Sequence, residues 1–400
     1  MKVIILAAGE GSRMRPLTYS RPKVMLPLAN KPILEHSLIQ VREAGIGEFI
    51  FVVGYCDEQV RNYFGNGEKW GVHIDYCAQR KQQGTADALE RARDLIDGPC
   101  LMLNGDTVFN HEDIQCLTGM TGNTMSVVEA QETGELGVVE LDKDRVIRIY
   151  EKAGEMSFTT ANAGMYLFTP DIFDAISKTP KSPRGEYEIT TTLQLKIDKG
   201  ERISYHRIKS WLDFSYPWDM LDANESLIAE SEVQSLGKVE DNVIIQGKVS
   251  VGQNTVIRSG SYIVGPVSIG QHCDIGPNCY IRPGTSIGDS CHIGSAVEIK
   301  NSIIMKGSKI PHQNYIGDSI IGEGCNFGAG AKVANLRLDR KNVEINNLDT
   351  KRRKLGAIVA DGVQIGINAC LNVGSVIGNN ARIGPGAVAS GTISPDSRIF

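Results

Sequence analysis

The sequence contains no apolar run that approaches the roughly 20 residues needed for a membrane-spanning helix. Its nine cysteines are an odd number, and the lack of any Cys-x-x-Cys spacing argues against a zinc site or a disulfide framework. Positive charge is not in excess, because 42 Lys and Arg residues face 47 Asp and Glu residues, and the formal charge is −5. That balance argues against nucleic acid or anionic lipid as a partner. These features are typical of a cytoplasmic protein with no membrane partner.

A length of 400 residues exceeds one ordinary domain and predicts two or three, and 41% hydrophobic residues can supply a packed core for each. The first eight residues are apolar enough to resemble a short signal peptide. Their apolar stretch is too short for one, and glycines and charges follow it, so a buried first strand is the better interpretation.

Up to about residue 230, short β-rich segments alternate with helical ones. Strands are predicted over residues 2–7, 48–53, 72–77 and 100–104, and helices over residues 33–44, 57–64 and 85–96. The alternation predicts a mostly parallel α/β sheet covered by helices on both faces, with ligands at the carboxyl ends of its strands. Residues 225–237 are expected to form a short polar helix and a connector.

From Val239 to Ile299 an aliphatic residue recurs every six positions, and Val, Ser, Thr or Cys stands four places after each. Neither a helix nor a hairpin sheet has that period, whereas a parallel β-helix does, with one large and one small side chain pointing inward from each flat face. The register shifts near Asn301 and near Asp318, and an excursion over residues 335–355 interrupts it. The change of pattern predicts two domains, residues 1–230 and 231–400. Four cysteines fall at small core positions of the repeat and are interpreted as core fillers: Cys273, Cys279, Cys291 and Cys325.

The loop after the first predicted strand carries the segment LAAGEGSRMRPLT, followed by Pro-Lys ending at Lys23. Gly9 and Gly11 let backbone N–H groups approach phosphates closely. Arg13 can donate two hydrogen bonds to phosphate oxygens, and Lys23 adds a point charge. The segment lacks the residues of a Walker A motif and of a dinucleotide fingerprint. It therefore predicts a phosphate-binding loop of another kind.

With this segment the chain resembles the sugar-1-phosphate nucleotidyltransferase superfamily, and further motifs follow in that family's order. They are QRKQQGTA at residues 79–86, Gly-Asp ending at Asp106, Gly137, Glu-Lys starting at Glu151, Asn-Ala-Gly starting at Asn162, and Trp-Asp ending at Asp219. The resemblance implies that Mg²⁺ is held by Asp106 and Asp219, and that Arg13 and Lys23 are catalytic. It implies a sugar-phosphate site of Gly137, Glu151 and Asn162. It implies a nucleotide site of Leu6, Ala7, Ala8, Gly9, Gly11, Gln79, Gln82, Gly84 and Thr85.

Each of these residues taken singly has a plainer interpretation. Asp106 after a glycine fits a turn, Asp219 fits the first turn of a helix, and glutamines are common on surfaces. The ordered set favours function. One departure is Ala153, where relatives often have proline, and it concerns the sugar loop. An amide can pair with the hydrogen-bonding edge of uracil or thymine, so UTP and dTTP both remain open as the nucleotide.

The reaction implied is in-line attack of a sugar phosphate oxygen on the α-phosphorus of the nucleotide, with release of pyrophosphate. Magnesium and basic residues hold the phosphates. Because the nucleophile is already anionic, no side-chain nucleophile or general base is required.

In the second half, Arg282 stands eighteen residues before Lys300, and eighteen residues are one full coil, so these two residues should stack on one edge. The segment of residues 297–335 then resembles the acetyltransferase half of the bifunctional N-acetylglucosamine-1-phosphate uridylyltransferase/glucosamine-1-phosphate acetyltransferase family. The likeness covers nearly the whole chain and is greatest to the archaeal branch. It implies a Rossmann-like nucleotidyltransferase domain followed by a left-handed parallel β-helix of hexapeptide repeats.

This second resemblance implies that His312 is the general base for the attacking amine, a role that suits an imidazole. It implies that Arg282 and Lys300 hold the sugar phosphate, and that Ala329 contacts the acetyl group or thioester of acetyl-CoA. It implies an amino-sugar site completed by Tyr315, Asn326 and Asn335. Acetyl-CoA is expected at the seam between subunits of a homotrimer. The arm at residues 335–339 reads NLRLD where the bacterial family has an Asn-Tyr-Asp-Gly turn.

The expected function is bifunctional. One half transfers acetyl from acetyl-CoA to glucosamine 1-phosphate or galactosamine 1-phosphate, and the other joins UTP or dTTP to N-acetylglucosamine 1-phosphate or glucose 1-phosphate. The alternatives are a monofunctional nucleotidyltransferase of the UDP-glucose, dTDP-glucose or GDP-mannose pyrophosphorylase type with a structural, trimerising β-helix, and a regulatory paralogue. For the basic run at residues 351–354, contact with the CoA phosphates and a solvated loop are both open.

Overall fold

The computed structural model describes residues 1–129, 137–151, 159–209 and 211–400. Its contacts divide the chain into two compact units. The first contains Met1–Glu10, Arg21–Met25 and Ile33–Asp213, and the second contains Gly11–Ser20, Leu26–Pro32 and Phe214–Phe400. Two short segments of the N-terminal region therefore belong to the unit that also holds the repeats. No helix in the described ranges is long and apolar enough to cross a membrane.

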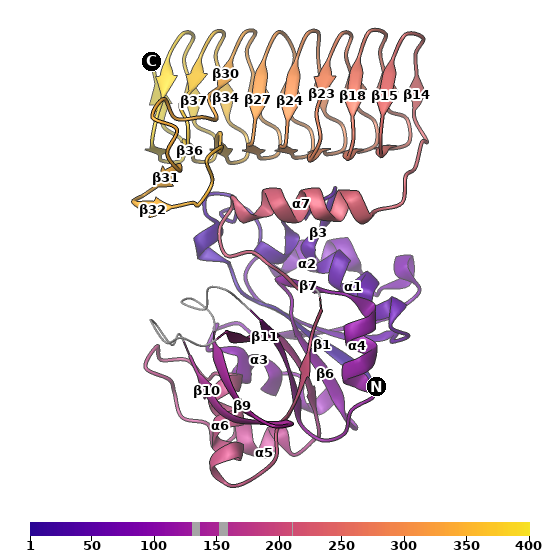
Figure 1. Ribbon diagram of the computed structural model, residues 1–400, viewed down its shortest axis with the longest axis vertical. Coiled ribbons are helices and arrows are strands. Elements are labelled where there is room, and N and C mark those ends of the chain that lie inside the picture. The colour runs from indigo at the N-terminus through magenta and orange to yellow at the C-terminus, as the bar shows by residue number, and fades with distance from the viewer. Residues whose placement is uncertain (130–136, 152–158, 210) are drawn as a thin grey trace. The chain divides into compact units, whose positions relative to one another are not determined.

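A nine-stranded sheet forms the centre of the first unit (Figure 1). Its order is β5 (His73–Ala78), β4 (Glu48–Val53), β1 (Lys2–Ala7), β6 (Cys100–Asn104), β11 (Thr160–Phe168), β8 (Thr124–Glu129), β12 (Ser204–Arg207), β10 (Arg145–Tyr150) and β9 (Val138–Asp142). The four predicted strands pair in parallel, as expected, with shifts of one residue in β5. β7 (Thr107–Phe109) and β13 (Trp211–Asp213) form a separate antiparallel pair.

The expectation of a mostly parallel sheet is wrong beyond β6. There β11 runs antiparallel to both β6 and β8, and β9 and β10 form a hairpin. The hairpin turns at Lys143, which has a positive φ of 54°. Antiparallel neighbours can be joined by so short a turn, whereas the parallel strands of the first half need long connections, which are usually helical. The result is a mixed sheet with a parallel half that carries the phosphate-binding segment.

Helices cover both faces of this sheet, which confirms the layered prediction. Val3 and Ile5 of β1 pack into a core with α1 (Ile33–Glu43), α2 (Asp57–Phe64) and α4 (His111–Thr118), while Ile4 packs on the other side. The elements on that other side are α3 (Thr85–Glu90), α5 (Ile172–Ile176) and α6 (Ile189–Asp198). Short 3-10 turns lie at Ser12–Met14, Lys23–Met25, Glu68–Trp70 and Arg93–Leu95.

Helix α3 ends six residues earlier than predicted. The 3-10 turn at Arg93–Leu95 follows it. Residues far away in the sequence form hydrogen bonds with polar groups of this turn. The Arg93 guanidinium donates to the carbonyl oxygen of Phe173 at 2.6 Å, and the Lys2 ammonium donates to that of Leu95 at 2.7 Å. These distant partners were not visible in the local pattern.

The second unit contains a parallel β-helix of three sheets, which confirms the six-residue repeat. One sheet comprises β14 (Lys238–Val239), β17 (Val256–Ile257), β20 (Asp274–Ile275), β23 (His292–Ile293), β26 (Lys309–Ile310), β29 (Asn326–Phe327), β34 (Gln364–Ile365), β37 (Arg382–Ile383) and β40 (Arg398–Ile399). A second comprises β15 (Ile244–Gln246), β18 (Tyr262–Val264), β21 (Tyr280–Ile281), β24 (Glu298–Lys300), β27 (Tyr315–Gly317), β30 (Lys332–Val333), β35 (Cys370–Leu371) and β38 (Val388–Ala389). The third comprises β16 (Val249–Val251), β19 (Val267–Ile269), β22 (Thr285–Ile287), β25 (Ile303–Ile304), β28 (Ile320–Ile321), β33 (Ile358–Val359), β36 (Val376–Ile377) and β39 (Thr392–Ile393).

The two predicted register shifts fall where expected. Ile269 pairs with Ile287, eighteen residues on, but Ile287 pairs with Ile304, one residue fewer. The missing residue is lost at a corner where Asn301 has φ 43°, and a second short corner has Asp318 at φ 48°. Asn and Asp tolerate this left-handed conformation better than most residues, so the corner can tighten without leaving the stack.

The four repeat cysteines are buried in the β-helix core. Each thiol approaches a carbonyl of the next coil, as Cys279 Sγ does with Gly294 O at 2.8 Å. Burial raises the pKa of Cys291 and of Cys325 to about 12. The thiols therefore stay protonated and inert, as the core-filler interpretation predicts.

Helix α7 (Asp219–Glu230) lies alongside the β-helix within this second unit (Figure 1), and the connector expected up to residue 237 follows it. Asn224 on this helix is fully buried. Its amide oxygen accepts hydrogen bonds from Ala29 N and Ser286 Oγ, both at 2.9 Å, and its amide nitrogen donates to Gly284 O at 3.0 Å. Ala29 lies between β2 (Pro27–Leu28) and β3 (Lys31–Pro32), so one amide joins three segments.

The excursion leaves the stack after β30 and returns before β33. It contains a small hairpin of β31 (Glu344–Ile345) and β32 (Leu348–Asp349). Leu355 N donates to Asn335 O at 3.0 Å and closes its base. Val343 is buried, and a Cβ at Gly374 would lie 2.7 Å from Val343 Cγ1, so the excursion packs closely on a coil corner.

Phe327 lies fully buried in the β-helix core. We expect Phe327→Ala to lower the free energy of unfolding by about 3–5 kcal/mol, because it leaves a cavity that the flat coils cannot close. Phe400→Ala deletes the same atoms from a side chain that is 89% exposed, and should change little. Guanidinium denaturation followed by circular dichroism compares the two variants. Equal midpoints would contradict the core packing.

Candidate functional sites

The phosphate-binding segment passes from the first unit into the second at Gly11. Gly11 has a positive φ of 75°. The 3-10 turn that follows is closed by Met14 N donating to Gly11 O at 2.8 Å, and Thr18 Oγ1 donates to the same oxygen at 3.1 Å. The Arg13 guanidinium lies 5.7 Å from the centroid of the Tyr216 ring. That ring stacks in turn on Trp218, and the two centroids are 4.7 Å apart. An aromatic surface thus orients the predicted catalytic arginine.

Asp219 begins α7 in the same unit. Its Oδ2 accepts the backbone N–H groups of Ser215 at 2.9 Å and Tyr216 at 2.8 Å. The pKa of the Asp219 carboxyl is raised, because burial outweighs the lowering effect of these two hydrogen bonds and of the charge of Arg352. Both hydrogen bonds use one oxygen, so Oδ1 is directed elsewhere. A half-buried carboxylate held this way suits a hard cation such as Mg²⁺.

In the first unit, Lys23 and Asp106 meet. Lys23 is buried, and its Nζ lies 2.8 Å from Asp106 Oδ2. Asp106 follows β6, and Gly105 before it donates from its N–H to Leu6 O at 3.0 Å. A Cβ on Gly105 would lie only 2.5 Å from that oxygen. The Gly-Asp order therefore has a steric cause, since only glycine lets the end of β6 approach the end of β1.

No group of three or more His, Cys, Asp or Glu side chains that could hold a metal is present in the described part of the chain. Mg²⁺ is commonly bound by one or two protein carboxylates together with substrate phosphates. Asp106 and Asp219 can each supply one such carboxylate. Asp106 and Asp219 belong to different compact units.

The motif at residues 79–86, whose amides are expected to pair with the base, is hydrogen-bonded to the start of the phosphate-binding segment within the first unit. Gln82 Nε2 donates to Ala8 O at 2.8 Å. Gln79 is buried, and its Nε2 donates to Gly84 O at 3.0 Å and Asp87 Oδ2 at 2.8 Å. The amide nitrogen of Gln79 thus holds the protein together, which is a role that the sequence pattern did not reveal.

Gly84 has φ +107°, and a Cβ there would lie 2.3 Å from Tyr187 O. The next residue, Thr85, accepts a hydrogen bond from Ile189 N at 2.9 Å. The glycine of the QRKQQGTA motif is therefore required by a close backbone approach. Tyr187 and Ile189, which the sequence analysis missed, hold the other side of this contact.

The three predicted sugar-phosphate residues lie together. Asn162 N donates to Gly137 O at 2.8 Å, and a Cβ on Gly137 would lie 3.8 Å from Glu151 Oε1. Asn162 Nδ2 donates to the Tyr166 hydroxyl at 2.6 Å. Burial raises the pKa of Glu151 and of Tyr166. Residues 152 and 153, on which the Glu-Lys motif and the Ala153 departure depend, lie outside the described residues.

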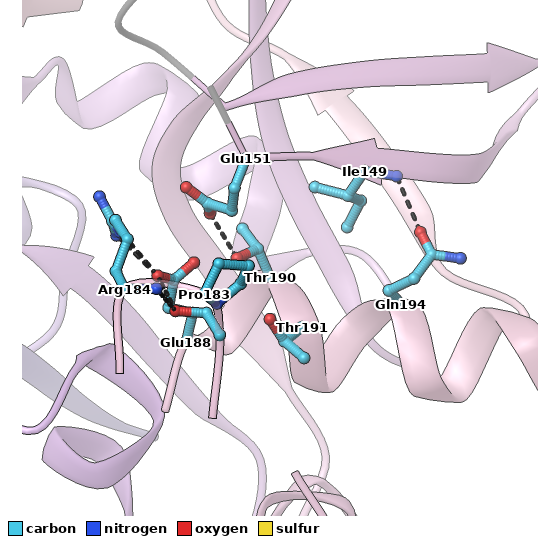
Figure 2. Close-up of a pocket in the computed structure, with 9 residues that line it drawn as sticks. Ile149, Glu151, Pro183, Arg184, Glu188, Thr190, Thr191 and Gln194 are labelled. Carbon is cyan, nitrogen blue, oxygen red and sulfur yellow. Dashed lines mark hydrogen bonds and ion pairs between the residues drawn. The ribbon is translucent and has the colours of Figure 1, made fainter. Parts of the chain in front are cut away.

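A cavity of about 320 Å³ opens beside Glu151 (Figure 2). Thr190 Oγ1 donates to Glu151 Oε1, and Arg184 Nη2 lies 2.8 Å from Glu188 Oε1. Glu188 Oε2 is buried and has no hydrogen-bond partner among the described residues. Sequence analysis missed this wall of the site. The segment GEYEIT at residues 185–190, with two acidic residues before a threonine, was the available signal.

In the β-helix, Asp318 is the centre of a polar cluster. It is buried, and its carboxylate oxygens accept from Lys300 Nζ at 3.1 Å, Asn301 Nδ2 at 2.9 Å and Asn335 Nδ2 at 2.5 Å. Asn335 Nδ2 also donates to the Tyr315 hydroxyl at 3.1 Å. Two of the predicted amino-sugar residues, Lys300 and Asn335, therefore bind one acid that the sequence marked only as a short corner, and Tyr315 joins the cluster through Asn335.

Arg282 lies beside this cluster, and the predicted stacking on Lys300 is confirmed. Ile281 pairs with Ile299, so the residues that follow them are in register. Arg282 Nη1 bonds Glu298 Oε1 at 2.9 Å, and its guanidinium lies 5.5 Å from the Tyr280 ring centroid. The glutamate keeps the pKa of the Arg282 guanidinium raised.

His312 lies at the corner before β27 and is exposed. Gly330 N donates to His312 O at 2.9 Å, which places Ala329 and Gly330 on the same corner one coil later. Asn326 lies on β29, in a different sheet from Tyr315. The structure therefore brings His312 and Ala329 to one edge of the second sheet and Lys300 and Asn335 to the other. Within one chain, Asn326 is not on the same face as Tyr315.

Two family models match this chain. Residues 2–230 match the nucleotidyl transferase family model, and residues 263–350 match a model described as the GMPPB C-terminal domain. The bifunctional protein GlmU of Methanococcus maripaludis strain C7 is 42% identical over 100% of this chain and 97% of that protein. The bifunctional sugar-1-phosphate nucleotidylyltransferase/acetyltransferase of Sulfurisphaera tokodaii is 38% identical over 98% and 97%. A solved structure, a putative glucose-1-phosphate thymidylyltransferase from Bacillus anthracis, has a TM-score of 0.54 and 26% identity, covering 59% of this chain and 98% of that one.

The mixed sheet with its glycine-rich segment defines a nucleotidyltransferase that carries a β-helix, and the family model covers more than half of the chain. Its relatives match both parts at nearly full length. The chain belongs to the archaeal family of bifunctional sugar-1-phosphate nucleotidylyltransferase/acetyltransferases.

The Asp318 cluster can be tested directly. Asp318→Asn keeps the shape of the side chain but removes the charge that three donors share. We expect it to lower the free energy of unfolding of the β-helix by about 1–3 kcal/mol, because a buried, charge-assisted set of hydrogen bonds is lost. Asp339→Asn removes the same charge from an exposed pair with Arg337 and should have little effect. Chemical denaturation in which both variants match the wild type would contradict the central role of Asp318.

Proposed function

We propose that the chain is a bifunctional enzyme of UDP-N-acetyl-amino-sugar synthesis. Residues 1–230 would transfer a nucleotidyl group from UTP or dTTP to N-acetylglucosamine 1-phosphate or glucose 1-phosphate. Residues 231–400 would transfer acetyl from acetyl-CoA to glucosamine 1-phosphate or galactosamine 1-phosphate. The observation that carries this proposal is a polar cluster in which Lys300 and Asn335 donate to the buried Asp318 and Asn335 also donates to the Tyr315 hydroxyl, which a purely structural β-helix does not need. The cytoplasm is the proposed location.

For nucleotidyl transfer, the backbone of residues 6–9 and Gly11 would hold the triphosphate, and Gln79, Gln82, Gly84 and Thr85 would shape the base site. Asp106 and Asp219 would hold Mg²⁺, which when bound neutralises phosphate charge. An oxygen of the sugar phosphate attacks the α-phosphorus, and the bond to the β-phosphate oxygen breaks. Arg13 and Lys23 stabilise the charge on the departing pyrophosphate. The contact of Lys23 with Asp106 and of Arg13 with Tyr216 supports this, because both cations are held in place.

The sugar phosphate of this half would lie against Gly137, Glu151 and Asn162. Of these three, Glu151 lines the cavity in Figure 2, and Gly137 and Asn162 lie next to it in the structure. Glu151 accepts from Thr190 and so has one carboxylate oxygen committed. The second oxygen can accept from a sugar hydroxyl, which supports a substrate with a hydroxyl-rich sugar ring.

For acetyl transfer, Arg282 and Lys300 would hold the phosphate, and Tyr315, Asn326 and Asn335 would position the amino sugar. The amine nitrogen attacks the thioester carbonyl of acetyl-CoA, the carbon–sulfur bond breaks, and CoA leaves as the thiolate. His312 takes the proton that the amine loses and can return it to the departing sulfur, which gives the CoA thiol. Ala329 on the same corner would contact the acetyl group, which the bond between Gly330 N and His312 O supports.

The separation of these residues on one chain supports a homotrimer. His312 and Ala329 lie at one edge of the second sheet, and Lys300 and Asn335 at the other, while Asn326 faces away from Tyr315. Neighbouring copies that pack along their coils would bring different edges together. Each acetyltransferase site would then contain residues from two chains.

The monofunctional alternative keeps nucleotidyl transfer but gives the β-helix only a trimerising role. The match of residues 263–350 to the GMPPB C-terminal domain favours it to that extent. The regulatory alternative loses catalysis altogether, and the paired Lys23 and Asp106 argue against it. The Asp318 cluster and the full-length relatives support the bifunctional proposal over both.

Two substitutions should separate the activities. Asp106→Ala should abolish nucleotidyl transfer because it removes a metal ligand, and His312→Ala should lower acetyl transfer by about 10²–10⁴ because it removes the base. Each variant should retain the other activity and so serve as its control. Pyrophosphate release with Mg²⁺ and thiol release with acetyl-CoA measure the two reactions. If the wild type never releases CoA with any amino-sugar phosphate, the β-helix is structural.

The full-length protein should be a trimer in solution, because the acetyltransferase site needs edges from neighbouring chains. Light scattering should return three times the mass of one chain across micromolar concentrations. An acetylating enzyme that stays monomeric throughout would overturn the shared site.

A further inference from the structure

The excursion of the β-helix reaches the first turn of α7 within the second unit. Arg352 Nη1 lies 2.7 Å from Asp222 Oδ2. Asp222 stands one turn after Asp219 on the same helix. Arg352 belongs to the basic run for which contact with the CoA phosphates and a solvated loop were both open. In the structure it contacts the helix that begins with Asp219, a proposed metal ligand.

Arg352 is well fixed by its own segment. Val343 N donates to Arg352 O at 2.8 Å, and Thr350 Oγ1 donates to Val343 O at 2.7 Å. Val343 packs against Gly374 of the coil stack. Rigid coils thus hold the backbone from which this guanidinium projects.

The side chain of Arg352 is only 16% exposed, whereas that of Asp222 is 75% exposed. Arg352 Nε is buried and has no hydrogen-bond partner among the described residues. Leaving a buried donor without a partner has a free-energy cost, and an ordinary surface ion pair does not require it. A burial of this kind indicates that the charge is needed at this position.

The first turn of α7 connects two proposed nucleotidyl-transfer residues. Asp219 accepts the N–H of Tyr216, and the Tyr216 ring lies under the Arg13 guanidinium. A shift of that turn would move the Asp219 carboxylate and the aromatic surface that orients Arg13 together. Asn224 anchors the helix one turn further along, and two buried side chains, Met220 and Leu221, pack the first turn, to which Arg352 adds an ion pair.

We propose that Arg352, carried by the β-helix excursion, is a positioning residue for nucleotidyl transfer: its ion pair with Asp222 fixes the first turn of α7 and thereby Asp219 and Tyr216. The inference rests on the proposed role of Asp219. It makes the nucleotidyl-transfer reaction depend on a residue of the acetyltransferase half.

The test uses the full-length protein. Arg352→Ala should lower kcat for pyrophosphate release by about tenfold and raise the Mg²⁺ concentration for half-maximal rate, with little change in KM for the nucleotide. Arg352→Lys should recover most of the rate, because an ammonium can still reach Asp222. Asp222→Asn should reproduce the loss, and the double variant should be no slower than either single variant.

A second measurement does not depend on activity. Hydrogen exchange followed by mass spectrometry should show faster exchange at the Ser215 and Tyr216 amides in Arg352→Ala, because their acceptor is no longer held. Arg337→Ala is the matched control, since it removes the same charge from the same excursion, where Arg337 pairs only with nearby Asp339. It should change neither rate nor exchange.

An Arg352→Ala protein that matches Arg337→Ala in turnover, Mg²⁺ dependence and amide exchange, beside an active wild type, overturns this inference alone. A wild type that releases no pyrophosphate overturns the proposed function, and the positioning role falls with it. A loss in Arg352→Ala that Arg352→Lys does not rescue at all would show that bulk, rather than the ion pair, is what matters, and would also overturn the proposal.

Discussion

Backbone hydrogen bonding from each coil of the β-helix to the next is the constraint on which the second unit depends. It holds equivalent residues of successive coils in line, so Arg282 is carried over Lys300, and the His312 corner meets the Ala329 corner. No loop is needed to assemble these groups. The same rigidity means that a corner shortened by one residue cannot relax elsewhere. Asn301 and Asp318, which sit at the two short corners, become fixed polar groups.

Asp318 illustrates how a structural need and a chemical one coincide. A tight corner favours a residue that tolerates the left-handed conformation, and Asp is among the few that do. Once buried there, its carboxylate must find donors, and Lys300, Asn301 and Asn335 supply them. These partners are then held in fixed rotamers, as a binding site requires. A Cβ on the neighbouring Gly317 would lie 2.6 Å from both Asn335 Nδ2 and the Tyr315 hydroxyl, so a side chain there would displace both groups from the cluster.

Helix α7 performs a similar double role. Its buried Asn224 joins it to the β-helix and to the loop at Ala29, and its first residue is a proposed metal ligand. Two of the residues proposed for nucleotidyl transfer, Arg13 and Asp219, are therefore grouped with the repeats, while Lys23 and Asp106 are grouped with the mixed sheet.

The sequence by itself determined the period of the β-helix, its two short corners, the first four strands and the ordered motifs, because each is a local pattern that repeats or that sterics enforce within a few residues. The glycines at 84 and 105 were visible only as members of the ordered motifs, because the backbone atoms that require them, Tyr187 O and Leu6 O, belong to residues far away in the sequence. Only the tertiary structure decided that the Gln79 amide nitrogen is used internally, that Asp318 gathers three donors, and that Arg352 pairs with Asp222. The last of these joins residues 130 positions apart. A polar side chain gives no local sign of its partner, since a hydrogen bond depends on where two distant backbones are brought, and that placement is set by the packing of the whole unit.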